Sequence, residues 1–135
     1  MKKSKVILPD TNAVLRYLLH DHEEHFAKAS EFFEAIREDK RQSILLQGVL
    51  VECVYVLTKF YQVPRAEAAG KLHDLLQYKG MRNSDRQELL DALKHYAKTK
   101  LDIVDCILLA KGSDDNMEVF SFDTDLLSKI DLRLR

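Results

Sequence analysis

The stretch that decides the fold reads Val6-Ile7-Leu8-Pro9-Asp10-Thr11-Asn12, and Ala13-Val14-Leu15-Arg16-Tyr17-Leu18-Leu19 follows at once. A short apolar run ends in an acid, and an amphipathic run begins directly after it. This pattern predicts a buried strand that ends at Asp10 and a helix that begins at Thr11 or Asn12. Ligands of open α/β sheets bind beyond the carboxyl ends of the strands, whereas Asp is also a preferred helix N-cap. We therefore interpret Asp10 as either a helix cap or a site residue.

The length and charge of the chain narrow the classes of protein to consider. Its 135 residues suit one domain, 1–135, that is large enough to bury a core. The formal net charge is −1, so no overall field attracts nucleic acid or a membrane surface. A nucleic-acid partner would therefore need a local basic patch or a bound metal ion.

The cysteines and the apolar runs bear on the compartment. Cys53 and Cys106 each lie inside an apolar helical run, which predicts buried free thiols and fits a reducing cytoplasm. The first apolar run is only three residues long before Pro9, too short for a signal peptide. No run approaches the ~20 residues of a membrane span, so we expect a cytoplasmic protein without a membrane partner.

Apolar runs and helical periodicity alternate along the chain. Further strands are predicted at Ser43–Leu46 and Met117–Phe122, with an edge strand at Leu132. The predicted helices cover about 23–37, 49–60, 64–78, 84–96, 102–111 and 126–130. Strands separated by helices imply parallel pairing, which predicts an α/β fold: a three-layer α/β/α sandwich with a mainly parallel central sheet. The long helical segment, about 48–98, is interpreted as an insertion within this one domain.

Four acids stand where the apolar pattern predicts burial or a sheet edge. Asp123 follows the strand at 117–122 as Asp10 follows the first, so we expect both at the same edge of the sheet. Glu52 and Asp105 each interrupt an apolar helix. Acids are almost never fully buried unpaired, and two carboxylates ~4 Å apart repel by about 4 kcal/mol at an effective dielectric of ~20. Converging carboxylates would need protons or a cation, and oxygen ligands suit Mg²⁺ or Mn²⁺.

A plainer interpretation of the same acids stays open. Glu52 would lie on the solvent face of its helix, and the aspartates would be helix caps. Asp102 competes with Asp105 for the metal site, because the two lie three residues apart on one helical face. Position favours Asp102 as the N-cap and Asp105 as the ligand.

These residues resemble the motifs of the PIN-domain nucleases and, within them, of the VapC-type toxin ribonucleases. Four segments match in order: Leu8-Pro9-Asp10-Thr11-Asn12 with Arg16-Tyr17-Leu18-Leu19, Val51-Glu52-Cys53-Val54-Tyr55-Val56-Leu57, Asp105-Cys106-Ile107-Leu108-Leu109-Ala110, and Ser121-Phe122-Asp123-Thr124-Asp125-Leu126. The resemblance spans nearly the whole chain. Two positions depart from the family pattern, Pro9 before the first Asp and Ser121 where Thr is usual.

The resemblance implies roles for particular residues. Asp10, Glu52, Asp105 and Asp123 would form a metal-binding catalytic quartet for Mg²⁺ or Mn²⁺. Thr11, Asn12 and Ser121 would position carboxylates, water or phosphate around the metal, and Arg16 is a candidate phosphate contact with a surface salt bridge as its alternative. Asp125 is interpreted as a first-turn helix acid rather than a fifth ligand.

The resemblance also implies a reaction and partners. It implies an Mg²⁺-dependent endoribonuclease that hydrolyses RNA phosphodiester bonds, acts as the toxin of a toxin–antitoxin pair, and associates with a cognate antitoxin protein and a second copy of itself. The main alternative is a non-catalytic PIN-like module that binds RNA or protein. A phosphatase that acts through an aspartyl intermediate fits less well, because Asp10-Thr11-Asn12 lacks the second aspartate two residues after the nucleophile.

Overall fold

A short parallel sheet holds the N-terminal strand in place. The computed structural model describes residues 5–134, and side chains to residue 130. Strand β1 (Val6–Ile7) pairs in parallel with β2 (Gln42–Ser43), Val6 opposite Gln42. Ser43 is fully buried, and its hydroxyl donates to the carbonyl of Ile7 at 2.8 Å. Parallel strand pairing, as the alternation of strands and helices predicts, is therefore confirmed.

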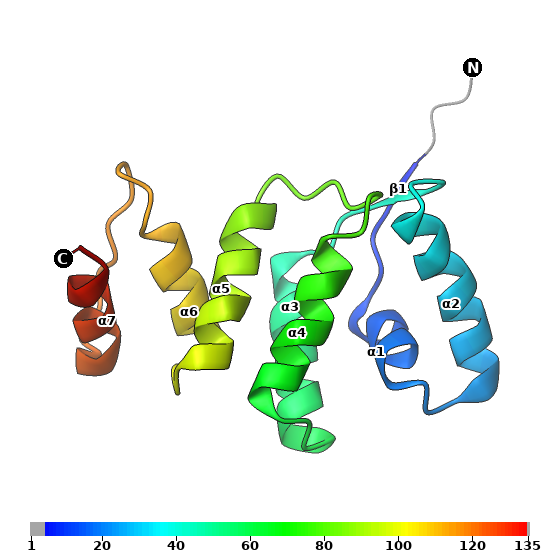
Figure 1. Ribbon diagram of the computed structural model, residues 1–135, viewed down its shortest axis with the longest axis horizontal. Coiled ribbons are helices and arrows are strands. Elements are labelled where there is room, and N and C mark those ends of the chain that lie inside the picture. The colour runs from blue at the N-terminus through cyan, green and yellow to red at the C-terminus, as the bar shows by residue number, and fades with distance from the viewer. Residues whose placement is uncertain (1–4, 135) are drawn as a thin grey trace.

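Eight helical segments make up most of the described chain, and Figure 1 shows α1 and α2 at one end of the molecule and α7 at the other. Their bounds are α1 Thr11–Leu19, α2 Glu23–Arg37, α3 Gln47–Tyr55, the π-helix η1 Val56–Phe60, α4 Arg65–Leu76, α5 Arg86–Lys98, α6 Ile103–Lys111 and α7 Thr124–Leu134. No helix of the described residues is long and apolar enough to cross a membrane.

The sheet is smaller than the sequence pattern predicts. Residues 117–122 form no strand, and Leu132 lies in α7 rather than in an edge strand. A turn precedes this segment, since Asp114 accepts the backbone N–H groups of Asn116 and Met117 at 2.8 and 2.9 Å. Phe120 and Phe122 are then 86% and 89% exposed. The strand predicted at Met117–Phe122 is therefore wrong for this structure: its apolar residues lie in the loop between α6 and α7.

The second predicted strand is also shorter than expected, and side-chain bonds replace part of its ladder. Asn83 donates to the carbonyl of Leu45 at 2.8 Å and accepts the N–H of Leu45 at 3.0 Å. The backbone N–H of Ser43 donates to the carbonyl of Gly80 at 2.9 Å. A Cβ at Gly80 would lie 2.6 Å from the carbonyl oxygen of Ile36, so only glycine fits this close approach.

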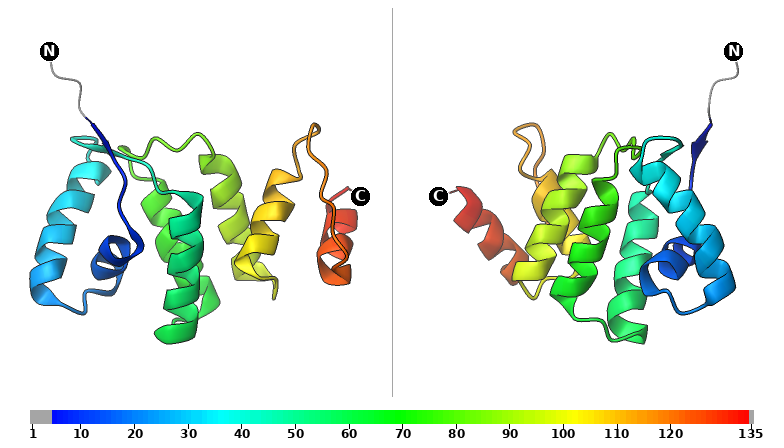
Figure 2. Two further views of the ribbon diagram at one scale, coloured as in Figure 1. Left: turned by 180° about the vertical axis from the view of Figure 1, so that it is seen from behind. Right: turned by 45° about the vertical axis from the view of Figure 1, so that its right-hand side comes forward.

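The core lies between the helices and includes side chains from all eight helical segments, η1 among them through Leu57. α4 and α5 pack side by side, and α3 packs against both α1 and α6 (Figure 2). Arg65 joins α4 to α5 and to the loop before α6, because its guanidinium donates to the carbonyls of Tyr96 and Leu101 and lies 3.6 Å from the centre of the Tyr96 ring. Cys53 and Cys106 are buried free thiols, as predicted.

A π-helix extends α3 by one wide turn. In η1 the N–H of Tyr61 donates to the carbonyl of Val56 at 3.1 Å, a bond that spans five residues instead of four. Leu57 is buried in the core, whereas Phe60 is 75% exposed. The next helix begins after Pro64, whose fixed φ suits a helix start, as predicted.

Candidate active site

Asp10 caps helix α1. Its Oδ1 accepts the backbone N–H of Ala13 at 2.8 Å, and its carbonyl accepts the N–H of Val14 at 3.2 Å. This satisfies one of the N–H groups that a helix start leaves without a partner. The side chain is nevertheless exposed, so the carboxylate remains accessible from solvent. The helix-cap interpretation of Asp10 is confirmed, and capping leaves the second carboxylate oxygen available to a ligand.

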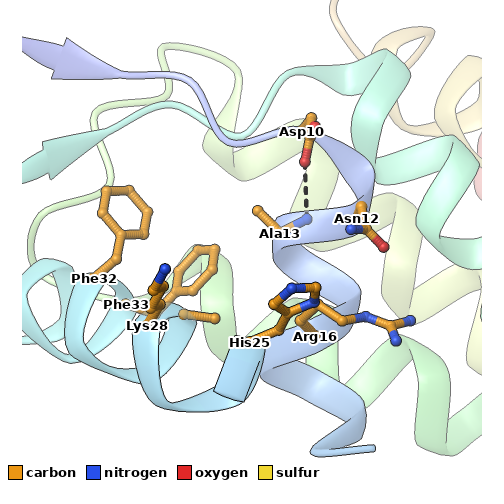
Figure 3. A pocket seen from close by; sticks show the side chains of 9 residues that line it. Asp10, Asn12, Ala13, Arg16, His25, Lys28, Phe32 and Phe33 are labelled. Atoms are coloured by element: carbon orange, nitrogen blue, oxygen red, sulfur yellow. Dashed lines mark hydrogen bonds between the residues drawn. The ribbon is translucent and has the colours of Figure 1, made fainter. Parts of the chain in front are cut away.

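A hollow of about 350 Å³ opens beside Asp10, between α1 and α2 (Figure 3). Nine residues line it: Asp10, Asn12, Ala13, Arg16, His25, Lys28, Ala29, Phe32 and Phe33. Three of them are site residues predicted from the sequence, and Thr11 is half-buried at the start of the same helix. The first motif thus faces a cavity, with Arg16, His25 and Lys28 as its basic side chains.

Arg16 is held by neighbours on the far side of α1. It forms an ion pair with Asp21 at 2.9 Å and donates to the hydroxyl of Tyr61 at 3.1 Å. The bond to Tyr61, followed by the Asp21 charge, raises the pKa of Arg16 against the opposing effect of burial. The salt-bridge alternative for Arg16 is therefore realised, and the side chain is fixed beside the hollow.

Glu52 is exposed on α3, next to the buried thiol of Cys53. Burial raises the pKa of Cys53 to about 12, and the charges of Glu52 and Asp10 add to this effect. The two acids, 42 positions apart in sequence, therefore both lie close enough to the thiol of Cys53 to affect its pKa. Because α3 packs against α1, this neighbourhood follows from the helix arrangement.

Asp102 and Asp105 lie at different positions of α6, Asp102 at the predicted N-cap and Asp105 in the first turn. The role of Asp105 as a metal ligand stays a prediction. Asp102 takes the N-cap position of α6, but its carboxylate accepts the hydroxyl of Tyr55 at 2.7 Å instead of a backbone N–H. That hydrogen bond, with burial and the charges of Asp102 and Asp105, raises the pKa of Tyr55 to about 12. Asp105 is half-buried, and burial, then the charges of Asp123 and Asp102, raise its pKa.

Asp123 also caps a helix. Its Oδ1 accepts the N–H groups of Asp125 and Leu126 at 2.9 and 3.1 Å, and its own N–H donates to the hydroxyl oxygen of Ser121 at 3.0 Å. Asp125 lies exposed in the first turn of α7, as predicted. The expectation that Asp10 and Asp123 share a sheet edge is wrong here, because the residues before Asp123 form no strand.

The donor set fits a hard divalent cation by its chemistry. All four predicted ligands are carboxylates, and Mg²⁺ and Mn²⁺ prefer such oxygens. Across the part of the chain whose side chains are described, no three acids, histidines or cysteines lie together in a group that could hold a metal ion. The structure therefore brings the acids into two electrostatic neighbourhoods, Asp10 with Glu52 and Asp105 with Asp123, without assembling a closed ligand cage.

Sequence reasoning missed the second wall of the hollow. His25, Lys28, Ala29 and Phe32 follow helical spacing on one face of α2. The periodicity of the apolar residues accounts for Ala29 and Phe32 as packing residues and gives no role to Lys28. The presence of a lysine and a histidine on the same stripe as the aromatic residues was the available signal.

A comparison with protein families identifies the family of the chain. The sequence pattern of the PIN domain matches residues 7–132, from β1 into α7. No curated protein and no solved structure matches the chain significantly. The family match covers all four acids and both walls of the hollow, and the parallel strand pair with its surrounding helices is consistent with an α/β PIN-like fold. The protein belongs to the PIN domain family.

Proposed function

We propose that the protein is an Mg²⁺-dependent endoribonuclease that hydrolyses RNA phosphodiester bonds. PIN domains are generally metal-dependent nucleases that act on nucleic acid. The observation that carries the proposal for this chain is the PIN domain match over residues 7–132, which includes all four acids. Burial, followed by the charges of Asp123 and Asp102, also raises the pKa of Asp105. A divalent cation would stabilise the ionised form of an acid that neighbouring negative charges disfavour.

In this proposal Asp10, Glu52, Asp105 and Asp123 hold Mg²⁺ or Mn²⁺. A bound ion would polarise the scissile phosphate and lower the pKa of a coordinated water. The chain's own part is to orient these groups: Ala13 fixes the rotamer of Asp10 through the cap bond, and Ser121 fixes the backbone of Asp123. Thr11 and Asn12, beside Asp10, are proposed to position water or phosphate.

We further infer a toxin role, with a cognate antitoxin, a homodimeric state and a cytoplasmic location. The resemblance of the four motifs to VapC-type toxins supports this inference. The exposed carboxylates of Asp10, Glu52 and Asp123 support a route to silencing, since an arginine or lysine of a partner could pair with them and displace the cation.

RNA cleavage by the purified protein tests the proposal. We expect cleavage of total RNA with Mg²⁺ or Mn²⁺ and none in EDTA. Asp10→Asn preserves a helix cap but removes the charge, and we expect it to lower the rate by at least about 100-fold, the order of effect when a group that stabilises the transition state is lost. Asp74→Asn, an exposed acid of α4, is the matched control and should retain full activity.

Expression in cells tests the toxin role separately. The unmodified protein should arrest growth, whereas Asp10→Asn and Asp105→Asn should be harmless at equal protein levels. If all three arrest growth equally, growth arrest does not depend on this site, and the toxin inference fails.

The absence of a metal-ligating group among the described side chains favours one alternative, a non-catalytic module that binds RNA or protein. Binding of RNA without cleavage in either metal, by protein whose fold is verified, would select this alternative.

A further inference from the structure

We propose that the hollow between α1 and α2 is a ribonucleotide subsite, which holds the phosphate and base of an RNA nucleotide next to the one that the acids would cleave. Its place in a reaction rests on the proposed nuclease function. Its capacity to bind a nucleotide does not, because no metal ion takes part in it.

The hollow has the size and the floor of a ligand site. At about 350 Å³ it falls in the range of small-molecule pockets. Phe33, which is fully buried, forms part of the lining, and its ring stacks on Tyr17 with centres 4.7 Å apart. Tyr17 in turn shares a 2.7 Å hydrogen bond with Tyr78. Phe33 at the base of the hollow is therefore packed against core residues, and its position does not depend on a loop.

The charges that line the hollow favour an anion at the α2 side. Lys28 is exposed, and none of the ion pairs found among the described residues uses it. Arg16 is held by the carboxylate of Asp21, which offsets part of its charge, and by the hydroxyl of Tyr61. In Figure 3 the Lys28 ammonium lies across the hollow from the carboxylate of Asp10. A phosphate therefore finds its cation at Lys28 and is kept away from Asp10 by repulsion.

The remaining lining residues suit a nucleobase. Phe32 is half-buried and His25 is exposed, and both rings line the hollow. Planar aromatic side chains stack on unpaired bases of RNA, and an amide such as that of Asn12 can bond to base edges. The combination of a free lysine, two rings and an amide within one cavity matches a mononucleotide better than a purely apolar or purely anionic ligand.

The orientation follows from the two ends of the hollow. Asp10 belongs to the proposed catalytic quartet and also lines this cavity. A nucleotide seated with its phosphate at Lys28 would lead the RNA chain past Asp10. The subsite would thus position the scissile bond and contribute to the choice of substrate.

The test titrates the full-length protein with adenosine 5′-monophosphate in EDTA, followed by calorimetry and by amide shifts in NMR spectra. We expect shifts that centre on Asn12, Ala13, Lys28 and Ala29. Lys28→Ala should raise the dissociation constant about tenfold because one charge contact is lost, and a tenfold change corresponds to about 1.4 kcal/mol. Lys129→Ala, an exposed lysine of α7, is the matched control and should bind as the unmodified protein does.

Two further ligands separate the parts of the subsite. Adenosine, which lacks the phosphate, should bind more weakly and be insensitive to Lys28→Ala. Inorganic phosphate should be sensitive to Lys28→Ala and insensitive to Phe32→Leu, which keeps apolar bulk but removes the stacking ring. Shifts that map outside α1 and α2, or an unchanged dissociation constant in Lys28→Ala, would overturn the proposal.

RNA cleavage gives a readout that distinguishes the two proposals. With an active enzyme, Lys28→Ala should lower kcat/KM chiefly through a higher KM. If the unmodified protein cleaves no RNA but binds the nucleotide in this hollow, the nuclease proposal fails and the subsite stands. If it cleaves RNA and the nucleotide does not bind here, the subsite fails and the nuclease stands.

Discussion

Asp10 and Asp123 each follow a short apolar run and cap the helix that comes next, but the runs before them are packed differently. The run before Asp10 contains β1, which pairs with β2 and is held through Ser43. The run before Asp123 has no strand partner, and Phe122 is 89% exposed. The same local pattern therefore places Asp10 after a paired strand at one end of the molecule and Asp123 after an unpaired loop at the other.

The two apolar runs differ in whether a neighbouring strand is available to pair with them, and not in their own sequence pattern. A parallel strand needs a neighbour with matching backbone groups, and a crossover of at least a dozen residues to reach it. β1 reaches β2 across α1 and α2. Residues 117–122 follow a turn at Asp114 and lead into α7, which packs against α6. Local sequence can thus determine a cap without determining the strand before it.

The largest contrast is expected between two phenylalanines of these regions. Phe33 is fully buried beneath the hollow, so Phe33→Ala should lower the free energy of unfolding by about 3–5 kcal/mol. Phe122→Ala, at an exposed position, should change it by less than about 0.5 kcal/mol. Urea denaturation measures both values. Equal losses would show that residues 117–122 are packed as firmly as the core.

Leu126, the buried residue that holds α7 to the core, should affect the stability of α7 alone. Leu126 is 1% exposed, and Leu126→Ala creates a cavity whose ordinary cost is about 2–5 kcal/mol. Because α7 packs against α6 alone among the larger helix contacts, we expect release of α7 before global unfolding. Hydrogen exchange should then quicken at the amides of α7, while the global transition moves by less than about 1 kcal/mol. Leu127→Ala, at a more exposed position, is the control.

Removing the two helix caps should affect stability differently at the two ends of the molecule, with smaller effects than the core substitutions. Asp10→Ala removes the bond to Ala13 and should lower the global free energy of unfolding by about 1 kcal/mol, whereas Asp10→Asn should stay within a few tenths. Asp123→Ala loses two backbone bonds but should affect only the exchange rates of α7. A global loss of about 1 kcal/mol in Asp123→Ala would contradict this view of the two regions.

The smallest effect concerns the pKa of Asp105. Burial and the charges of Asp123 and Asp102 raise it above the ordinary 3.8, so the folded state disfavours the ionised form. The stability linked to Asp105 is therefore fully present below pH 3.8 and is lost as the pH rises through the raised pKa. Asp123→Asn should move that pKa down toward its ordinary value, but not fully, because burial is the larger cause. Carbon NMR titration of the carboxyl group measures the shift, and an unchanged pKa would place Asp123 out of range.

Much of the fold could be predicted from periodicity and capping chemistry. The helix at Glu23–Arg37 has the predicted bounds, and α4 begins directly after Pro64, where a helix start is predicted. α6 ends at Lys111, as the range 102–111 predicts, and Asp102 occupies the predicted N-cap. The strand at 117–122 could not be predicted correctly, since an apolar run specifies burial or pairing only when a partner is within reach.

The residues of the candidate site could be named from the sequence, but their surroundings could not. The first motif predicted Asp10 as a helix cap or a site residue, and the structure shows the cap and a cavity beside it. The four acids fall within the region that matches the PIN domain. Lys28 and His25 belong to a helix whose apolar residues dominated its interpretation, so their contribution to the same cavity depends on how α2 packs across α1. The bond between Tyr55 and Asp102 joins residues 47 positions apart, and no local pattern indicates it.

The π-helix η1 has a consequence for changes in chain length. Its wide turn holds one residue more than an α-helical turn would, so removal of the exposed Lys59 should let α3 continue as an α-helix without rotating the residues before it. A deletion within Gln47–Tyr55 would instead turn every later side chain by about 100° and misplace the apolar face. Circular dichroism and melting of the two deletion variants would reveal the difference, and equal losses would remove the distinction. Val56–Phe60 is thus the segment of this helix where we expect the chain to lose a residue and keep Glu52 on its side of the molecule.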